Sequence, residues 1–248
     1  MTTEIVMHSS ADMLAATTAA RLVTRLVDLQ SAGRIPAIAL TGGGVGIDTL
    51  ARVASAPARG AVDWGRVEIY WGDERFVPRD DPERNERQAR QALLDHVDVD
   101  PQRVHAMAPS DGEFGADPDE AAAAYTALLA RHDHLDLVLL GMGPEGHVAS
   151  VFPDSPAVYD DRPVVAVRNC PKPPPTRVSL TLPTIRAATE VWLLVAGEPK
   201  AGAVAMALGG AGEVALPAAG AVGTARTLWL LDRAAASKLP PGLSRLPV

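Results

Sequence analysis

In some segments of the chain the apolar residues recur with the spacing of a helix, and in others they form short runs typical of a strand. The two kinds of segment alternate along the chain. A helical repeat starts at Ser10, a helix-capping residue, and runs to about Gln30. Its apolar face comprises Leu14, Thr18, Leu22, Leu26 and Leu29. Short runs with few polar residues, of which Leu135–Leu140 is the clearest, are typical of buried strands.

The alternation of strands and helices predicts an α/β fold. Strands are expected at Glu4–His8, Ile35–Leu40, Val67–Trp71, Leu135–Leu140, Val164–Val167, Val178–Leu182, Val191–Val195 and Thr227–Leu231. Further helices are expected at Ile47–Ala54, about Asn85–Asp95, Pro118–Arg131, Pro183–Ala188 and Pro199–Leu208, and after Asp232 as a cap. This order indicates βαβ units and a mostly parallel sheet with helices on both faces.

We expect one domain over residues 1–248, because no repeat is visible. The proline-rich stretch Cys170–Pro175 reads as a stiff loop between two apolar runs rather than as a domain boundary. In open parallel sheets, ligands bind beyond the carboxyl ends of the strands. The residues that follow each strand are therefore the candidates for chemistry.

Composition narrows the functional classes. Of 248 residues, 47% are hydrophobic, and the formal charge is −7, which argues against a nucleic-acid partner. Cys170 is the single cysteine, so an internal disulfide and a cysteine-rich zinc site are excluded. The N-terminus lacks the pattern of a signal peptide, and no apolar run has the length of a membrane span. These features predict a cytoplasmic protein that does not associate with membranes. They leave the oligomeric state open, and a monomer is one of the possibilities.

The glycines Gly42, Gly43 and Gly44 follow the second predicted strand and precede a helix. Glycine amides and a helix N-terminus suit a phosphate group. The alternative is a tight strand-to-helix turn that requires positive φ. The loop is neither a Walker loop nor a dinucleotide fingerprint.

Charged residues follow the third predicted strand, in the order Asp73, Glu74, Arg75. Charges next to a buried strand are costly unless they pair or bind a ligand. Asp73 could orient water or a sugar hydroxyl and Arg75 could hold an anion. The alternative is an internal salt-bridge cluster that closes the loop.

A histidine, His147, follows the strand Leu135–Leu140 after three glycines, where we expect a helix to begin. Imidazole titrates near neutral pH and can both accept and return a proton. Glu145, two residues earlier, could tune it. The other histidines show no metal-ligand spacing: His8, His96, His105, His132 and His134.

The remaining candidate site residues are cationic side chains. Lys172 lies among prolines and Arg177 follows, so both could hold an anion, although solvated surface charges are the plainer interpretation. Lys200, at the start of a late helix, is equally ambiguous. No nucleophile elbow is present, and nothing activates Cys170, so covalent catalysis is not indicated.

Several motifs in order resemble the 6-phosphogluconolactonase family, over about residues 10–237. They are Trp71-Gly-Asp-Glu-Arg75 with Asn85, Asp136–Pro153 with its Gly146-His147 pair, Pro171-Lys-Pro-Pro174 with Arg177–Pro183, Gly197–Ala201, and Trp229–Asp232. The resemblance implies a fold related to glucosamine-6-phosphate deaminase and ribose-5-phosphate isomerase. It implies hydrolysis of 6-phospho-D-glucono-1,5-lactone, a sugar-phosphate lactone of the pentose phosphate pathway, without metal or cofactor.

Carried over by position, the resemblance makes His147 the acid/base. It makes Gly42, Gly43, Gly44, Arg75, Lys172 and Arg177 candidate substrate contacts, to which Asp73 is added from its place at the strand end. Three departures stand out. The family's Ser-Gly-Gly-Ser-Thr-Pro loop is here Thr41–Gly46, its Asp before Gly-His is Glu145, and Pro217–Gly220 lacks a basic residue often found there.

The expected mechanism anchors the phosphate at Gly42–Gly44 with Arg177 and Lys172 and places the lactone carbonyl near His147. Amides near Gly143–Gly146 are expected to stabilise the oxyanion. Two alternatives stay open. An aminosugar-phosphate deaminase/isomerase would need a glutamate where Phe152 stands. A catalytically silent sugar-phosphate-binding module is compatible with the altered glycine loop.

Overall fold

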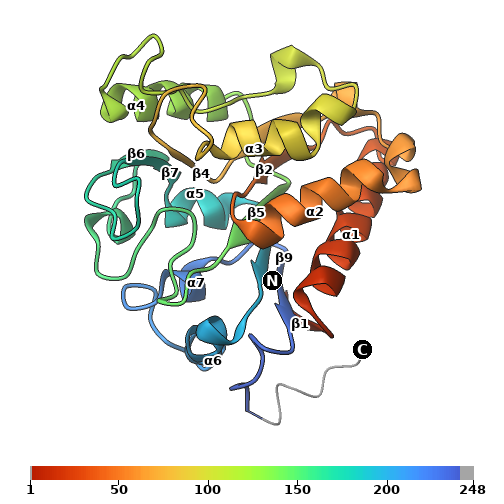
Figure 1. Cartoon of the computed structure of the whole chain (residues 1–248), viewed down its shortest axis with the longest axis vertical. Coiled ribbons are helices and arrows are strands. Elements are labelled where there is room, and N and C mark those ends of the chain that lie inside the picture. The colour runs from red at the N-terminus through yellow and green to blue at the C-terminus, as the bar shows by residue number, and fades with distance from the viewer. Residues whose placement is uncertain (1, 241–248) are drawn as a thin grey trace.

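A six-stranded parallel sheet forms the centre of the computed structural model, which describes residues 2–240 (Figure 1). The strand order is β1-β9-β8-β5-β2-β3, and every pairing is parallel. The strands are β1 (Thr2–His8), β2 (Ala37–Leu40), β3 (Glu68–Trp71), β5 (Leu137–Gly141), β8 (Glu190–Val195) and β9 (Arg226–Asp232). The expected α/β class with a mostly parallel sheet is confirmed.

Three further strands form a separate antiparallel sheet, in the order β4-β7-β6. They are β4 (Asp73–Arg75), β6 (Val164–Val167) and β7 (Arg177–Leu180). Two expectations were therefore wrong. The charged segment after β3 is a strand rather than a loop, and β6 and β7 do not extend the parallel sheet, because β7 pairs with β4 on one side and with β6 on the other.

Gly72 connects the two sheets. Its N–H donates to the Leu40 carbonyl of β2 at 2.9 Å, and its carbonyl accepts from the Leu180 N–H, also at 2.9 Å. The chain thus passes from one sheet into the other across a single residue. Asp73 and Arg75 in β4 consequently lie beside the carboxyl ends of β2 and β3.

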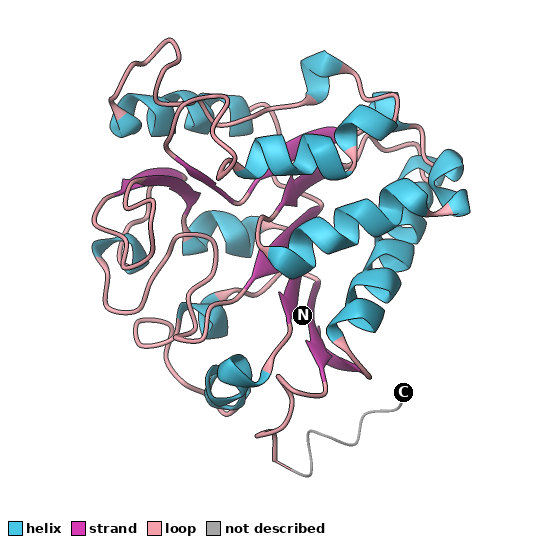
Figure 2. Cartoon of the chain, viewed as in Figure 1, coloured by secondary structure: helices cyan, strands magenta, loops and turns pink. Residues whose placement is uncertain are grey.

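Helices cover both faces of the main sheet (Figure 2). The α-helices are α1 (Ala11–Ser31), α2 (Gly44–Ser55), α3 (Asn85–Ala92), α4 (Pro118–Leu129), α5 (Leu182–Ala187), α6 (Ala201–Leu208) and α7 (Pro217–Gly220). Short 3-10 turns occupy Pro57–Ala61, Trp64–Arg66, Leu94–His96, Pro101–Arg103, Pro156–Val158 and Glu198–Lys200. At the start of α1, the Ser10 hydroxyl accepts from the Met13 N–H at 3.2 Å, so the predicted cap is confirmed.

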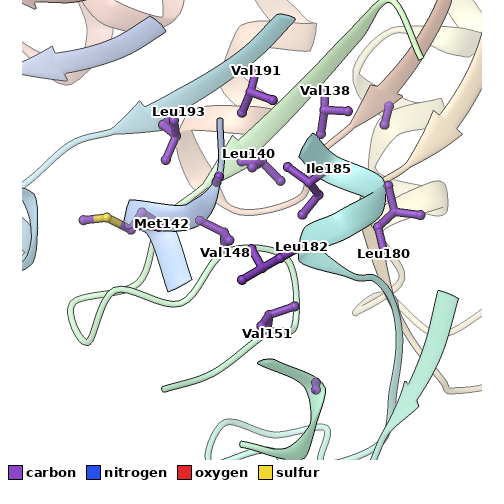
Figure 3. Packing of buried hydrophobic residues seen from close by; sticks show 14 of the residues in the cluster. Val138, Leu140, Met142, Val148, Val151, Leu180, Leu182, Ile185, Val191 and Leu193 are labelled. Atoms are coloured by element: carbon purple, nitrogen blue, oxygen red, sulfur yellow. The ribbon is translucent and has the colours of Figure 1, made fainter. Parts of the chain in front are cut away.

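Alternate residues of each strand face opposite layers, as the two-residue period of a strand requires. In β5, Leu137 and Leu139 pack with the layer of α1, α2 and α3, whereas Val138 and Leu140 pack toward α5. Figure 3 shows the second layer, in which Ile185 and Leu182 lie beside Val138 and Leu140. Because both faces are apolar, only the strand ends remain for polar chemistry.

Two expected helices are absent from the described residues. The chain after Asp232 forms turns up to Leu239, although the Asp232 carboxylate does accept from the Ala235 N–H at 2.7 Å. His147 lies in an irregular segment between β5 and Pro156, not at the start of a helix. Among residues 2–240, no helix combines the length and apolar character needed to cross a bilayer.

Candidate active site

A cleft of about 300 Å³ opens at the carboxyl edge of the main sheet, beyond β2 and β5. It collects all the site residues expected from the sequence, although they come from five segments. They are Gly42, Gly43, Gly44, Asp73, Arg75, His147, Lys172 and Arg177. The carboxyl ends of parallel strands meet at one edge, which explains why the glycine loop after β2 and His147 after β5 converge here, whereas Lys172 and Arg177 reach the cleft from the antiparallel sheet.

The glycine loop forms one wall. Gly43 has φ +81° and caps α2, so the turn does require a glycine conformation. Helix geometry leaves the N–H groups of the first turn, Gly44–Gly46, without intrahelical acceptors. The loop is thus a tight turn that requires a glycine, and it places amides without intrahelical acceptors at the positive end of a helix.

Asp73, Arg75 and Asn85 form a polar cluster beside the glycine loop, where the side chain of Asn85 lies against Gly42. Asn85 Oδ1 accepts from Arg75 Nη1 at 2.6 Å, and Asn85 Nδ2 donates to the Asp73 carbonyl at 2.8 Å. Asp73 Oδ2 accepts from the Ser150 hydroxyl at 2.7 Å. Because Asn85 is 2% exposed and bonds to both neighbours, it fixes their side chains relative to each other.

Glu74 points the other way and is fully buried. Its Oε1 accepts from the N–H groups of Arg75 and Asn85 at 2.7 Å, and its Oε2 accepts from the Glu86 N–H at 2.9 Å. Burial raises the pKa of Glu74 to about 7, although Arg84 and these N–H groups favour the charged form. This residue caps α3 and matches the salt-bridge alternative rather than a substrate contact.

His147 lies in the cleft with its ring stacked on Phe152, at a centroid distance of 4.4 Å. Its Nδ1 is 3.0 Å from Glu145 Oε1, but the ring N–H is not aligned for a hydrogen bond, and the contact becomes an ion pair only when the imidazole is protonated. Burial lowers the pKa of His147, Glu145 opposes this and Lys172 reinforces it. The imidazole is therefore neutral near pH 7 and able to accept a proton.

The two predicted cations after β6 are both engaged. Lys172 Nζ lies 3.2 Å from Glu145 Oε1. Arg177 donates through Nε to the Pro174 carbonyl at 2.8 Å and through Nη2 to the carbonyls of Lys172 and Pro173. Arg177 thus holds the proline loop in place, and only its Nη1, 3.7 Å from Asp73, faces another charged group.

Lys200 is a cleft residue that sequence reasoning left undecided. It lines the cleft and has no carboxylate within 4 Å among the described residues. Burial and the nearby Lys172 lower the pKa of its ammonium group. The sequence signals were its position at the start of a helix after β8 and its place in the Gly197–Ala201 motif, whereas proximity to Lys172 depends on the tertiary fold.

Two of the amides expected to form an oxyanion site near Gly143–Gly146 are already hydrogen-bonded within their own loop. The Gly143 N–H donates to the His147 carbonyl and the Gly146 N–H donates to the Gly143 carbonyl, each at 3.0 Å. These two amides shape the loop around His147 and are not free for substrate. No set of three His, Cys, Asp or Glu side chains within residues 2–240 is arranged to hold a metal ion.

Comparison with known proteins agrees with this arrangement. A family model described as glucosamine-6-phosphate isomerases/6-phosphogluconolactonase matches residues 9–229. The chain belongs to this family. A 6-phosphogluconolactonase of Streptomyces coelicolor is 56% identical over 98% of this chain and 97% of its own length.

Solved structures of the family agree in fold. The 6-phosphogluconolactonase of Trypanosoma brucei superposes with a TM-score of 0.83 at 28% identity, covering 96% of this chain and 99% of that one. A monomeric glucosamine-6-phosphate deaminase superposes with a TM-score of 0.81 at 20% identity, covering 95% and 99%. The latter likeness concerns the fold alone. At the position where the deaminase alternative requires a glutamate, this member of the family stacks Phe152 on His147.

Proposed function

We propose that the protein hydrolyses 6-phospho-D-glucono-1,5-lactone to 6-phospho-D-gluconate in the pentose phosphate pathway. The observation that carries the proposal is the cleft itself, where a half-buried imidazole, a helix N-terminus and several cations line one hollow of sugar-phosphate size. The name of the 56% identical relative supports the same activity. No metal or cofactor takes part in the proposed reaction.

The phosphate is proposed to bind at the glycine loop. Amides at the start of α2 and the helix dipole favour an anion, and the loop uses backbone donors where other members of the family have hydroxyls. Lys172 and Arg177 add positive potential from the proline loop. We add Lys200 to this set, since its charge has no acidic partner within 4 Å in the described chain.

His147 is proposed to act as the base and then as the acid. Its Nδ1 faces Glu145, so Nε2 is the nitrogen that takes a proton from water. The water oxygen bonds to the lactone carbonyl carbon, and the bond from that carbon to the ring oxygen then breaks. The imidazolium returns its proton to the departing ring oxygen, which becomes a hydroxyl group.

Asp73 and Arg75 are proposed to contact the sugar hydroxyls. Both line the cleft, and their bonds to Asn85 hold them in place. We further propose that the two sheets form one domain, because residues from both sheets line the same cleft, and that the protein acts as a monomer. A cytoplasmic location fits the single buried cysteine.

The test is lactone hydrolysis measured above the spontaneous rate, with the phosphorylated lactone and with glucono-1,5-lactone. The phosphorylated lactone is expected to react far faster, and His147→Ala to lose on the order of 10²–10⁴ in rate. The control is His134→Ala, because His134 is exposed and outside the cleft. Near-normal turnover by His147→Ala would contradict the assignment, and equal rates for both lactones would contradict the phosphate site.

A further inference from the structure

A second pocket, of about 350 Å³, lies away from the cleft and shares none of its lining residues. It is enclosed by α4, which lies at the top left of Figure 1, by the segment 106–114 and by the residues just before α3. The walls are mostly apolar and include Met107, Pro109, Phe114, Tyr125 and Leu128. The volume is in the range of small-molecule sites.

One wall holds a buried arginine. Arg84 is 1% exposed, and it lines the pocket. Its Nη2 donates to the Met107 carbonyl at 2.8 Å, while its Nε and Nη1 have no hydrogen-bond acceptor. A buried guanidinium is costly unless its donors are paired, so two unpaired nitrogens need an explanation.

The acidic groups near Arg84 do not supply the missing acceptors. Glu74 Oε2 is 3.7 Å from Nη2, and Glu86 Oε2 is 3.9 Å from Nε. Glu74 is already bound by three backbone N–H groups, and the other oxygen of Glu86 pairs with Arg90. At the rim, exposed Arg79 and Glu113 carry opposite charges and offset each other.

We propose that this pocket binds a small organic carboxylate whose apolar body packs against the apolar walls and whose charge is attracted by Arg84. Because Nε and Nη1 are buried, the attraction of Arg84 for a carboxylate in the pocket is one of charge, and a hydrogen bond would require the side chain to turn toward the ligand. Glu86 also lines the pocket, but its Oε1 pairs with Arg90, so Arg84 remains the buried cation that suits one negative charge on an apolar molecule. It does not suit a sugar phosphate, whose hydroxyl groups would be left without partners.

Benzoate is a suitable probe, and benzamide is its neutral counterpart of the same shape. Amide NMR shifts of the ¹⁵N-labelled full chain are recorded while each is added, with 6-phosphogluconate present to occupy the cleft. We expect saturable shifts for benzoate, centred on residues 106–114 and 121–128, and at least tenfold weaker binding of benzamide. Shifts centred on the cleft, no saturable shifts, or equal binding of both compounds would overturn the proposal.

A matched pair of variants on α4 isolates the pocket. Ala124 lines it, so Ala124→Leu fills its volume without removing Arg84. Ala123 is exposed on the same helix and does not line the pocket, so Ala123→Leu is the control. Ala124→Leu should weaken benzoate binding at least tenfold, and Ala123→Leu should not.

If Ala124→Leu and Ala123→Leu bound benzoate equally well, the proposal of a binding site in this pocket would be wrong. If Ala124→Leu fails to fold, the shift map of the unaltered chain decides by itself. That map is read from positions in the chain and does not depend on lactonase activity, so it remains valid if the proposed function is wrong.

Discussion

Glu145 Oε1 lies 3.0 Å from Nδ1 of His147, and the same oxygen lies 3.2 Å from Nζ of Lys172. The carboxylate therefore sits between the proposed base and a cation that is proposed to bind substrate. Burial lowers the pKa of His147 most strongly, Glu145 opposes that shift and Lys172 adds to it. Because Glu145 raises the pKa of His147 and Lys172 lowers it, replacing Glu145 should lower that pKa and replacing Lys172 should raise it.

The pH dependence of kcat/KM tests this arrangement. The protonated imidazole cannot accept a proton, so activity falls as the pH drops through the pKa of His147. Glu145→Gln removes a charge that stabilises the imidazolium, so the acidic limb should move to lower pH. Lys172→Met removes a repelling charge, so the limb should move to higher pH. The midpoint of the limb is compared with that of the unaltered protein.

The readout separates titration from substrate binding. Lys172→Met is also expected to raise KM, but a change in affinity alone lowers the curve without moving its acidic limb. If the acidic limb moved in the same direction in both variants, or moved in neither variant, Glu145 and Lys172 would not set the pKa of His147.

Gly42→Ala tests the positioning of the polar cluster. A methyl group on Gly42 would overlap the side-chain amide of Asn85. Asn85 would have to move and would release Arg75 and Asp73, which it holds by hydrogen bonds. We expect a loss in kcat/KM on the order of 10², as small misplacements in active sites typically cause.

Gly202→Ala provides the control for that substitution. Gly202 lies in α6, and an added methyl group would meet no atom within 4 Å. It should keep full activity and gain up to about 1 kcal/mol of stability, because alanine favours a helix more than glycine does. Full activity in Gly42→Ala would show that the position of Asn85 is unimportant for turnover.

Glu74→Gln tests the buried cap of α3. The Glu74 carboxylate accepts hydrogen bonds from three backbone N–H groups. In glutamine an NH₂ group replaces one of the oxygens, so at least one backbone N–H would face another donor. We expect the free energy of unfolding in urea to fall by about 2–3 kcal/mol, since hydrogen bonds to a charged group are lost and a buried N–H is left unpaired.

Glu83→Gln is the matched substitution for Glu74→Gln, because Glu83 is exposed in the adjacent loop. Its effect should stay within about 0.5 kcal/mol. If Glu74→Gln were as stable as Glu83→Gln, the carboxylate of Glu74 would not be what holds the start of α3.

The sequence alone predicted the parallel strands and most helices, because their periods are local. The apolar run Leu135–Leu140 and the face of α1 that follows Ser10 need no distant partner to be recognised. It also predicted which residues would line one cleft, since chain segments that follow parallel strands gather at one edge of a sheet. The turns after Asp232 escaped prediction, because one good cap does not make a helix.

Only the tertiary structure decided how those residues are used. The strand β4 reads as a charged loop until β7 pairs with it, and pairing between distant strands leaves no local signal. Arg177 looks like an anion clamp until its donors meet the carbonyls of the proline loop, and the amides of Gly143 and Gly146 look free until they bond within their own loop. Hydrogen bonds are short and directional, so which donors remain for a substrate is known only after every competing acceptor has been placed.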